Sequence, residues 1–191
     1  LTWSQVLTPT LNLSLGYDLI HNWGYLHSPY RQARVSGNLV PEIHPAQRTR
    51  HTLHGRLSFI IPESQAAFHA LMRAYADDWE INAVTPEARV YQMIGSSVLL
   101  RARYRFYTQS PSFFYALTYD DPQPFVTADP KMSPFHSHLV GAQVRIGLAF
   151  LNETPLEFLE DAWLSANFDY LFQTNRFGNA IIAQAALRIP F

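Results

Sequence analysis

Apolar and polar residues alternate along most of this chain, in segments of roughly ten residues. In the segment 97–109 apolar residues fill every second position, and Arg101, Arg103 and Arg105 stand between them. Period two is typical of a β-strand, and about ten residues is enough for a tilted strand to cross a bilayer. Three arginines on one face exclude that face from a sandwich core. The alternation predicts nine strands, near 1–7, 11–21, 50–61, 66–78, 82–93, 97–109, 138–150, 163–174 and 180–191.

The connections between these strands are of two kinds. Tight turns are predicted at Thr8–Thr10, Pro62–Gln65 and Ile94–Ser96, and long proline-containing loops at 22–49 and 110–135. Short turns at one end of a sheet and long loops at the other are typical of outer-membrane β-barrels. The segment Thr154–Trp163 contains a proline and acidic residues that suit a short helix, and a turn there is equally open.

Composition changes this picture in two ways. Charged residues make up only 15% of the chain, against about 25% in a typical soluble domain, while aromatic residues reach 14%, and this combination disfavours a disordered chain. Of the 14 basic residues only Lys131 is a lysine, a bias that indicates guanidinium groups held in fixed networks. The absence of cysteine excludes disulfides and thiolate metal sites, and the net charge of −1 argues against a nucleic-acid partner.

The fold that accommodates both features is all-β, a transmembrane antiparallel up-and-down β-barrel with its arginines inside. The outward face must then be neutral, because an arginine facing lipid near the bilayer centre would cost roughly 2–4 kcal/mol. Nine arginines face four carboxylates in this predicted interior, a surplus of five positive charges. The members of this network are Arg50, Arg56, Arg73, Arg89, Arg101, Arg103, Arg105, Arg145, Arg188, Asp18, Asp77, Glu87 and Asp169.

The end of the chain adds a second indication of a barrel. Leu187, Ile189 and Phe191 close an amphipathic last strand, which resembles the C-terminal signal that outer-membrane barrels present to their assembly machinery. Bacterial barrels have even strand numbers, so nine strands predict at least one further strand before Leu1. We therefore expect 1–191 to be a single barrel domain that lacks its N-terminal strand or strands, within a barrel of ten or more.

Aromatic residues near strand ends are expected to form the girdles that fix a barrel at the two bilayer surfaces. These residues are Trp3, Tyr25, Trp79, Tyr107 and Trp163. His136 and His138 share one strand face near three aspartates of a long loop, which makes them weak candidates for a metal site; a polar rim without a ligand is the alternative. No other metal site and no cofactor is predicted.

The interior residues allow three functions. The arginines can pair with the carboxylates and close the lumen as a structural plug, or they can bias a narrow channel toward anions. His54, Ser58, His69 and Glu87 all face the predicted lumen and hold the residue types of a hydrolase triad, although no local motif supports that arrangement. An interior packing network is the simpler interpretation of these four residues.

Several stretches of 1–150 resemble, in matching order, an uncharacterised family of Gram-negative outer-membrane β-barrels, a domain-of-unknown-function family. They are Thr2–Pro9, Gly24–Arg31, Arg48–Leu53, Arg73–Trp79, Tyr104–Ser110 and Phe113–Tyr115. The resemblance implies a barrel in the outer membrane of which this chain is the C-terminal part. It implies no activity.

We therefore expect an integral outer-membrane protein without enzymatic activity, a structural or scaffold component of an envelope assembly. A narrow, anion-biased channel or porin is the alternative, followed by a lipid-modifying outer-membrane enzyme and a soluble lipocalin-like barrel. The expected partners are outer-membrane lipid, lipopolysaccharide and the barrel assembly machinery. The acidic segment 153–161 is a further candidate contact for a periplasmic or envelope protein.

Overall fold

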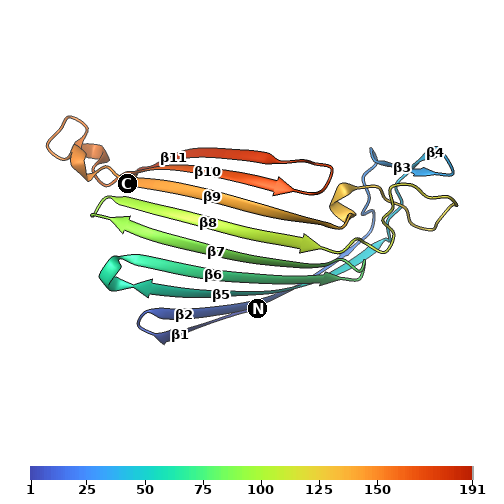
Figure 1. Ribbon diagram of the computed structural model, residues 1–191, viewed down its shortest axis with the longest axis horizontal. Helices are drawn as coiled ribbons and strands as arrows, with labels where there is room; N and C mark the ends of the chain where they lie inside the picture. Colours follow the sequence, from blue (N-terminus) through green and yellow to red (C-terminus); the bar gives the residue numbers. More distant parts are fainter. Residues whose placement is uncertain (191) are drawn as a thin grey trace.

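The computed structural model describes residues 1–190 and contains a large antiparallel sheet of nine strands. The strands lie side by side in chain order, from β1 at one edge to β11 at the other (Figure 1). All nine strands predicted from the alternation are present, and the all-β prediction is confirmed. Their bounds are β1 (Thr2–Thr8), β2 (Leu11–Trp23), β5 (Gln47–Ile61), β6 (Ala66–Asp77), β7 (Asn82–Ile94), β8 (Val98–Gln109), β9 (Phe135–Gly147), β10 (Trp163–Gln173) and β11 (Ala180–Arg188).

Within residues 1–190 each edge strand pairs on one side, β1 with β2 and β11 with β10. The sheet of the described residues is therefore open, as expected for part of a larger barrel, and closure into a barrel remains a prediction. None of the described helices is long and apolar enough to cross a membrane.

The two ends of the sheet differ in the length of their connections, as predicted. The turn end, on the left in Figure 1, carries 9–10, 62–65, 95–97 and the longer 148–162. The loop end, on the right, carries 78–81, 174–179 and two long segments, 24–46 and 110–134. We call these two long segments together the loop lobe.

The loop lobe contains a hairpin that the alternation does not reveal, formed by β3 (Gln32–Val35) and β4 (Asn38–Pro41). Its turn residues Ser36 and Gly37 both have positive φ, at 47° and 82°. Two successive residues of this kind make the type I′ turn that matches the twist of a two-residue hairpin, which explains the glycine.

Residues 1–190 contain four single turns of 3₁₀ helix and no α-helix: η1 (Pro62–Ser64), η2 (Pro130–Met132), η3 (Ala149–Leu151) and η4 (Glu157–Leu159). The short helix considered for Thr154–Trp163 is reduced to η4. Glu153 before it has a φ of 63°, outside the helical region, and the hydrogen bonds that follow span three residues. The segment is therefore a series of tight turns.

Strand register sorts the side chains onto two faces, because directly opposed residues of antiparallel strands point the same way. Asp169 on β10 opposes Gly141 on β9, which opposes Arg103 on β8, which opposes Arg89 on β7. We call the face that holds these residues the polar face and the opposite one the apolar face. No Asp, Glu, Lys or Arg of the nine strands lies on the apolar face.

Burial on this sheet is the inverse of that in a soluble domain. On β10 the carboxylate of Asp169 is 1% exposed, whereas its neighbours Phe168 and Tyr170 on the apolar face are 52% and 41% exposed. The whole chain exposes 12186 Å², against roughly 9,300 Å² expected for a compact monomer of its mass. The sheet thus leaves its apolar face uncovered and buries the carboxylates at the centre of its polar face.

The buried hydrophobic cluster of the described residues lies in the loop lobe instead of against the sheet. Ala33, Val35 and Val126 form its centre, and Val40 and Tyr119 pack around it. The main chain also joins the two segments of the lobe, since Ile43 and Val126 exchange hydrogen bonds of 3.0 and 2.9 Å. The lobe is therefore a small packed unit at the loop end.

Candidate functional site

The polar face carries a diagonal of arginines from the loop end to the turn end. It begins at Arg48 and Arg50 on β5 and ends at Arg188, the last residue of β11. All nine predicted interior arginines and all four predicted carboxylates lie on this face, and Arg48 is a tenth arginine that the sequence analysis left out. The face is therefore strongly basic.

Asp169 organises the centre of this face. Its carboxylate accepts hydrogen bonds from both nitrogens of the Arg103 fork, at 2.7 and 2.5 Å, and one from Asn167 at 2.6 Å. Arg101 in turn donates to the side-chain oxygen of Asn167 at 2.6 Å. Gly141 opposes Asp169 on β9, and a Cβ there would fall on the carboxylate, so only glycine leaves room for this side chain.

Glu87 on β7 holds a second pair of arginines. Its two oxygens accept hydrogen bonds from Arg89 at 2.5 Å and from Arg105 at 2.6 Å. The side chain of Glu87 is buried, while those of both arginines are partly exposed. One carboxylate therefore fixes two guanidinium groups and leaves a net positive charge beside it.

Asp77 anchors a third cluster, at the loop end. One oxygen accepts from Arg48 and from the Tyr75 hydroxyl, the latter at 2.6 Å, and the other accepts from the backbone amides of Trp79 and Ile81. Arg48 also lies 4.2 Å from the centre of the Trp79 ring. Arg48 stands two residues before Arg50, so the two side chains point to the same face of β5. The alternation could have identified Arg48 if the strand had been predicted to begin at Gln47.

The remaining arginines of the polar face have no carboxylate within ion-pair distance among residues 1–190. They include Arg56 and Arg73, whose side chains make no hydrogen bond within the described chain, and Arg145, whose guanidinium carbon lies 6.0 Å from the Trp163 ring centre. Asp18, the fourth predicted carboxylate, lies 3.5 Å from His54 instead. The structure thus groups part of the predicted network and leaves several cations available.

Three residues predicted for the aromatic girdle lie elsewhere. Trp79 is 2% exposed beneath the loop lobe, where its indole N–H donates to the Gln47 carbonyl at 2.8 Å. Tyr107 and Trp163 have the strand parity of the polar face, because they oppose Ser137 and Gly147. The sequence prediction used closeness to a strand end and did not consider on which face each residue lies.

The other aromatic predictions and the last strand are placed as follows. Trp3 lies on the apolar face and is 51% exposed, and Tyr25 lies in the loop lobe with its ring centre 3.9 Å from that of His27. Leu187 lies on the apolar face of β11 and is exposed, as is Ile189 just beyond the strand. Phe191 lies outside the described residues.

His136 and His138 lie on the apolar face of β9. His138 Nδ1 is hydrogen bonded to the Tyr104 hydroxyl at 2.7 Å, and its ring packs near Phe106 and Phe172. Asp129, the loop aspartate nearest in sequence, is buried and paired with Arg31 at 2.9 Å. Within residues 1–190 no group of three or more metal-ligating side chains is assembled.

The four residues considered for a hydrolase triad share the polar face. Ser58 directly opposes His69 on the neighbouring strand, and no hydrogen bond joins the two side chains in the described chain. Glu87 is occupied by Arg89 and Arg105. The face therefore brings the residue types together without the linked nucleophile and base that acyl transfer requires.

The chain was compared with family models, curated proteins and solved structures, and a family model matches it. A family model described as protein of unknown function, DUF3570, matches residues 1–173, which is most of the chain. The chain belongs to the DUF3570 family. No curated protein and no solved structure matches it.

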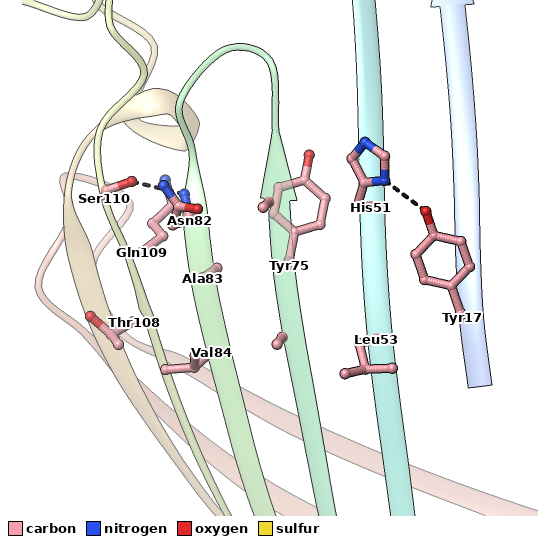
Figure 2. A pocket seen from close by; sticks show the side chains of 12 residues that line it. Tyr17, His51, Leu53, Tyr75, Asn82, Ala83, Val84, Thr108, Gln109 and Ser110 are labelled. Atoms are coloured by element: carbon pink, nitrogen blue, oxygen red, sulfur yellow. Dashed lines mark hydrogen bonds between the residues drawn. The ribbon is translucent and has the colours of Figure 1, made fainter. Parts of the chain in front are cut away.

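The apolar face of this DUF3570 chain is hollowed near the loop end. The hollow has a volume of about 560 Å³, and the small residues Ala74 and Ala76 of β6 are among those that line it. Leu53 on β5 and Val84 on β7 line it from the two neighbouring strands (Figure 2). The Tyr17 hydroxyl and His51 Nδ1 are hydrogen bonded at 2.8 Å at its rim. No lining residue is Asp, Glu, Lys or Arg, so the apolar face stays uncharged where it is hollowed.

The loop lobe of this DUF3570 chain contains a buried acid and base side by side. Glu42 accepts hydrogen bonds from the Thr127 hydroxyl at 2.9 Å and the Ala128 amide at 3.0 Å, and its other oxygen lies 3.4 Å from His44 Nε2. Burial lowers the pKa of His44 below its ordinary 6.5, while the Glu42 carboxylate opposes that shift. Burial has the opposite effect on the acidic hydroxyl of Tyr119 and raises its pKa. This hydroxyl accepts a hydrogen bond from the Thr127 amide at 2.8 Å.

Proposed function

We propose that this chain forms the wall of an integral β-barrel protein of the Gram-negative outer membrane, a structural or scaffold component without enzymatic activity. The observation that carries the proposal is the exposed apolar face, which holds no charged residue on any of the nine strands, whereas the opposite face holds all their charges. Closure of the barrel is part of the proposal.

Exposed and buried residues alternate along the strands, which supports contact with lipid on the apolar face only. Val140 at the middle of β9 is 58% exposed, and Leu139 beside it on the polar face is 7% exposed. A soluble sheet would cover such a face with a second layer, because exposed apolar patches of this extent are rare on soluble monomers. Hydrocarbon satisfies the same requirement for a membrane barrel.

A structural role is supported by the way the polar face is filled. Asp169, Glu87 and Asp77 each bind several donors, so their side chains form fixed bridges between strands: Glu87 and Asp77 to a neighbouring strand, and Asp169 across β9 to Arg103 on β8. The loop lobe adds a packed surface at one end, on which Tyr30 is 92% exposed and Leu39 is 59% exposed. Exposed large side chains on an ordered lobe suit contact with another envelope protein.

The test of membrane insertion is a charge placed on each face. Val140→Arg puts a guanidinium on the apolar face at mid-strand, and we expect it to destabilise the folded protein in bilayers by about 2–4 kcal/mol. The matched control is Gln184→Arg on the polar face of β11, with an expected effect below about 1 kcal/mol. Urea titration of the protein refolded into vesicles measures both variants, and equal effects would contradict the proposed orientation.

An anion-biased channel is the second candidate, and the arginine diagonal favours it. Basic side chains that line a pore select anions, and this face carries ten arginines against four carboxylates. Planar-bilayer recording distinguishes the two roles. Stable conductance with anion preference supports the channel, whereas a silent bilayer together with an envelope protein that co-purifies through the loop lobe supports the scaffold.

A further inference from the structure

Two cavities on the polar face share part of their walls. The first, at the loop end, has a volume of about 280 Å³ and is lined by Arg48 and Lys131 among others. The second, toward the middle of the sheet, has a volume of about 560 Å³. Arg73 and Thr85 line both cavities and directly oppose each other on β6 and β7. The cavities therefore follow one another along the strands and meet at this pair.

Both cavities are basic. Arg56, Arg73, Arg89 and Arg105 line the larger one, and Glu87 is its single carboxylate. That carboxylate is already shared by two of the four arginines. The smaller cavity adds two more cations and no carboxylate among its lining residues. A water-filled space with these walls attracts anions.

Arg73 at the meeting point and Arg56 in the adjoining part of the larger cavity are the cations that remain available. Arg73 opposes His54 on β5. Arg56 lies two residues further along β5, so its Cα atom is about 7 Å from that of His54. Both side chains are exposed and make no hydrogen bond or ion pair within residues 1–190. Each guanidinium thus offers a full set of donors, and the Thr85 hydroxyl adds a neutral one.

We propose that Arg73 and Arg56 form a binding site for a soluble, multiply charged oxyanion of the phosphate class, at the junction of the two cavities. A guanidinium fork matches the oxygens of a phosphoryl group in a bidentate way, which a halide cannot reproduce. This inference rests on the proposed function, because the polar face must line a water-filled interior for such an ion to reach it.

Titration calorimetry of the full chain in neutral detergent, with inorganic pyrophosphate as the probe, tests the site. We expect saturable binding that Arg73→Gln weakens about tenfold or more, the loss expected for a charged hydrogen-bond donor. The matched control is Arg188→Gln, which removes the same charge from the same face outside both cavities. An absence of saturable binding, or equal losses in the two variants, would overturn the proposal. Because Arg73 has no partner in the described chain, its replacement leaves the sheet contacts intact.

A second arm identifies the source of the phosphate group. Short-chain phosphatidylglycerol added to the detergent should compete with pyrophosphate only weakly, and lipid binding without pyrophosphate binding would overturn the proposal. Failure of the site and failure of the proposed function are distinguishable. A protein that inserts into vesicles but does not bind pyrophosphate contradicts the site alone, and one that binds through Arg73 but does not insert contradicts the membrane location alone.

Discussion

Three carboxylates on the polar face each act as a centre for several donors. Asp77 receives a guanidinium, a phenol and two backbone amides, and Asp169 receives an arginine fork and an amide side chain. A buried carboxylate is tolerated only when its oxygens are satisfied in this way. Hydrogen bonds between strands therefore determine which residues this face can hold. A small residue is needed where a charged side chain passes over a neighbouring strand.

Gly141 is such a position, and its replacement is a direct test of the pairing. Gly141→Ala places a methyl group on the Asp169 carboxylate and should displace it from Arg103, lowering the free energy of unfolding by about 1–3 kcal/mol. Gly55→Ala is the control, since its new Cβ meets a flexible Leu15 side chain at 3.2 Å and the Ser14 carbonyl oxygen at an ordinary contact distance of 3.9 Å. Urea unfolding followed by fluorescence measures both, and similar small effects would contradict the described packing.

The buried His44 predicts a pH dependence of the loop lobe. Because burial lowers the pKa of His44 in the folded lobe, the unfolded lobe binds a proton more readily, and the lobe loses stability as the pH falls below about 6.5. Hydrogen exchange corrected for intrinsic rates should show less protection of residues 24–46 and 110–134 at pH 5.5 than at pH 7.5. Greater protection at the lower pH would contradict this sign.

At the scale of elements, much of the sheet follows from the sequence and the loop lobe does not. Alternation locates all nine strands because each is long enough for period two to be visible and each has two chemically different faces. The hairpin of β3 and β4 has four residues per strand, too few for the pattern, although Ser36-Gly37 was a turn signal. The lobe packs through contacts such as Val35 with Tyr119, which are distant in sequence and leave no periodic trace.

The candidate site was likewise predicted in part from the sequence. Parity alone assigns every predicted arginine and carboxylate to the polar face, and the same parity would have assigned Tyr107 and Trp163 correctly. Parity says nothing of Trp79, which lies in a turn and is buried by Arg48 and Phe114. It also cannot show which arginines find a carboxylate, because that depends on how far each side chain reaches across neighbouring strands.

The packing of Trp79 makes a prediction about the lobe as a unit. Trp79→Ala removes a fully buried ring between the sheet and the lobe, and should cost about 3–5 kcal/mol of local stability while the strands stay paired. Limited proteolysis should then cut within 24–46 or 110–134. Trp23→Ala, at a residue that is 75% exposed, is the control and should leave the pattern of cleavage unchanged. Cleavage within the strands instead would contradict an independent lobe.

At the scale of the whole molecule, the distribution of charge explains the composition. The chain is nearly neutral, yet the charged residues of its nine strands all lie on one face, and arginines dominate there. The low charge content reflects the second face, which holds no charge at all. A sheet of this kind is stable in water only if something covers that face, and we propose that lipid does.

The most direct test of the central claim uses the absence of cysteine, which allows single cysteines to be labelled cleanly. Spin labels placed one at a time along β10, from Leu164 to Phe172, report collisions with oxygen in the bilayer and with a water-soluble nickel complex. We predict period two, with oxygen contact highest at Ala166, Phe168 and Tyr170 and lowest at Asn167 and Asp169. Uniform accessibility along the strand, or nickel contact highest at Phe168, would contradict a lipid-facing sheet.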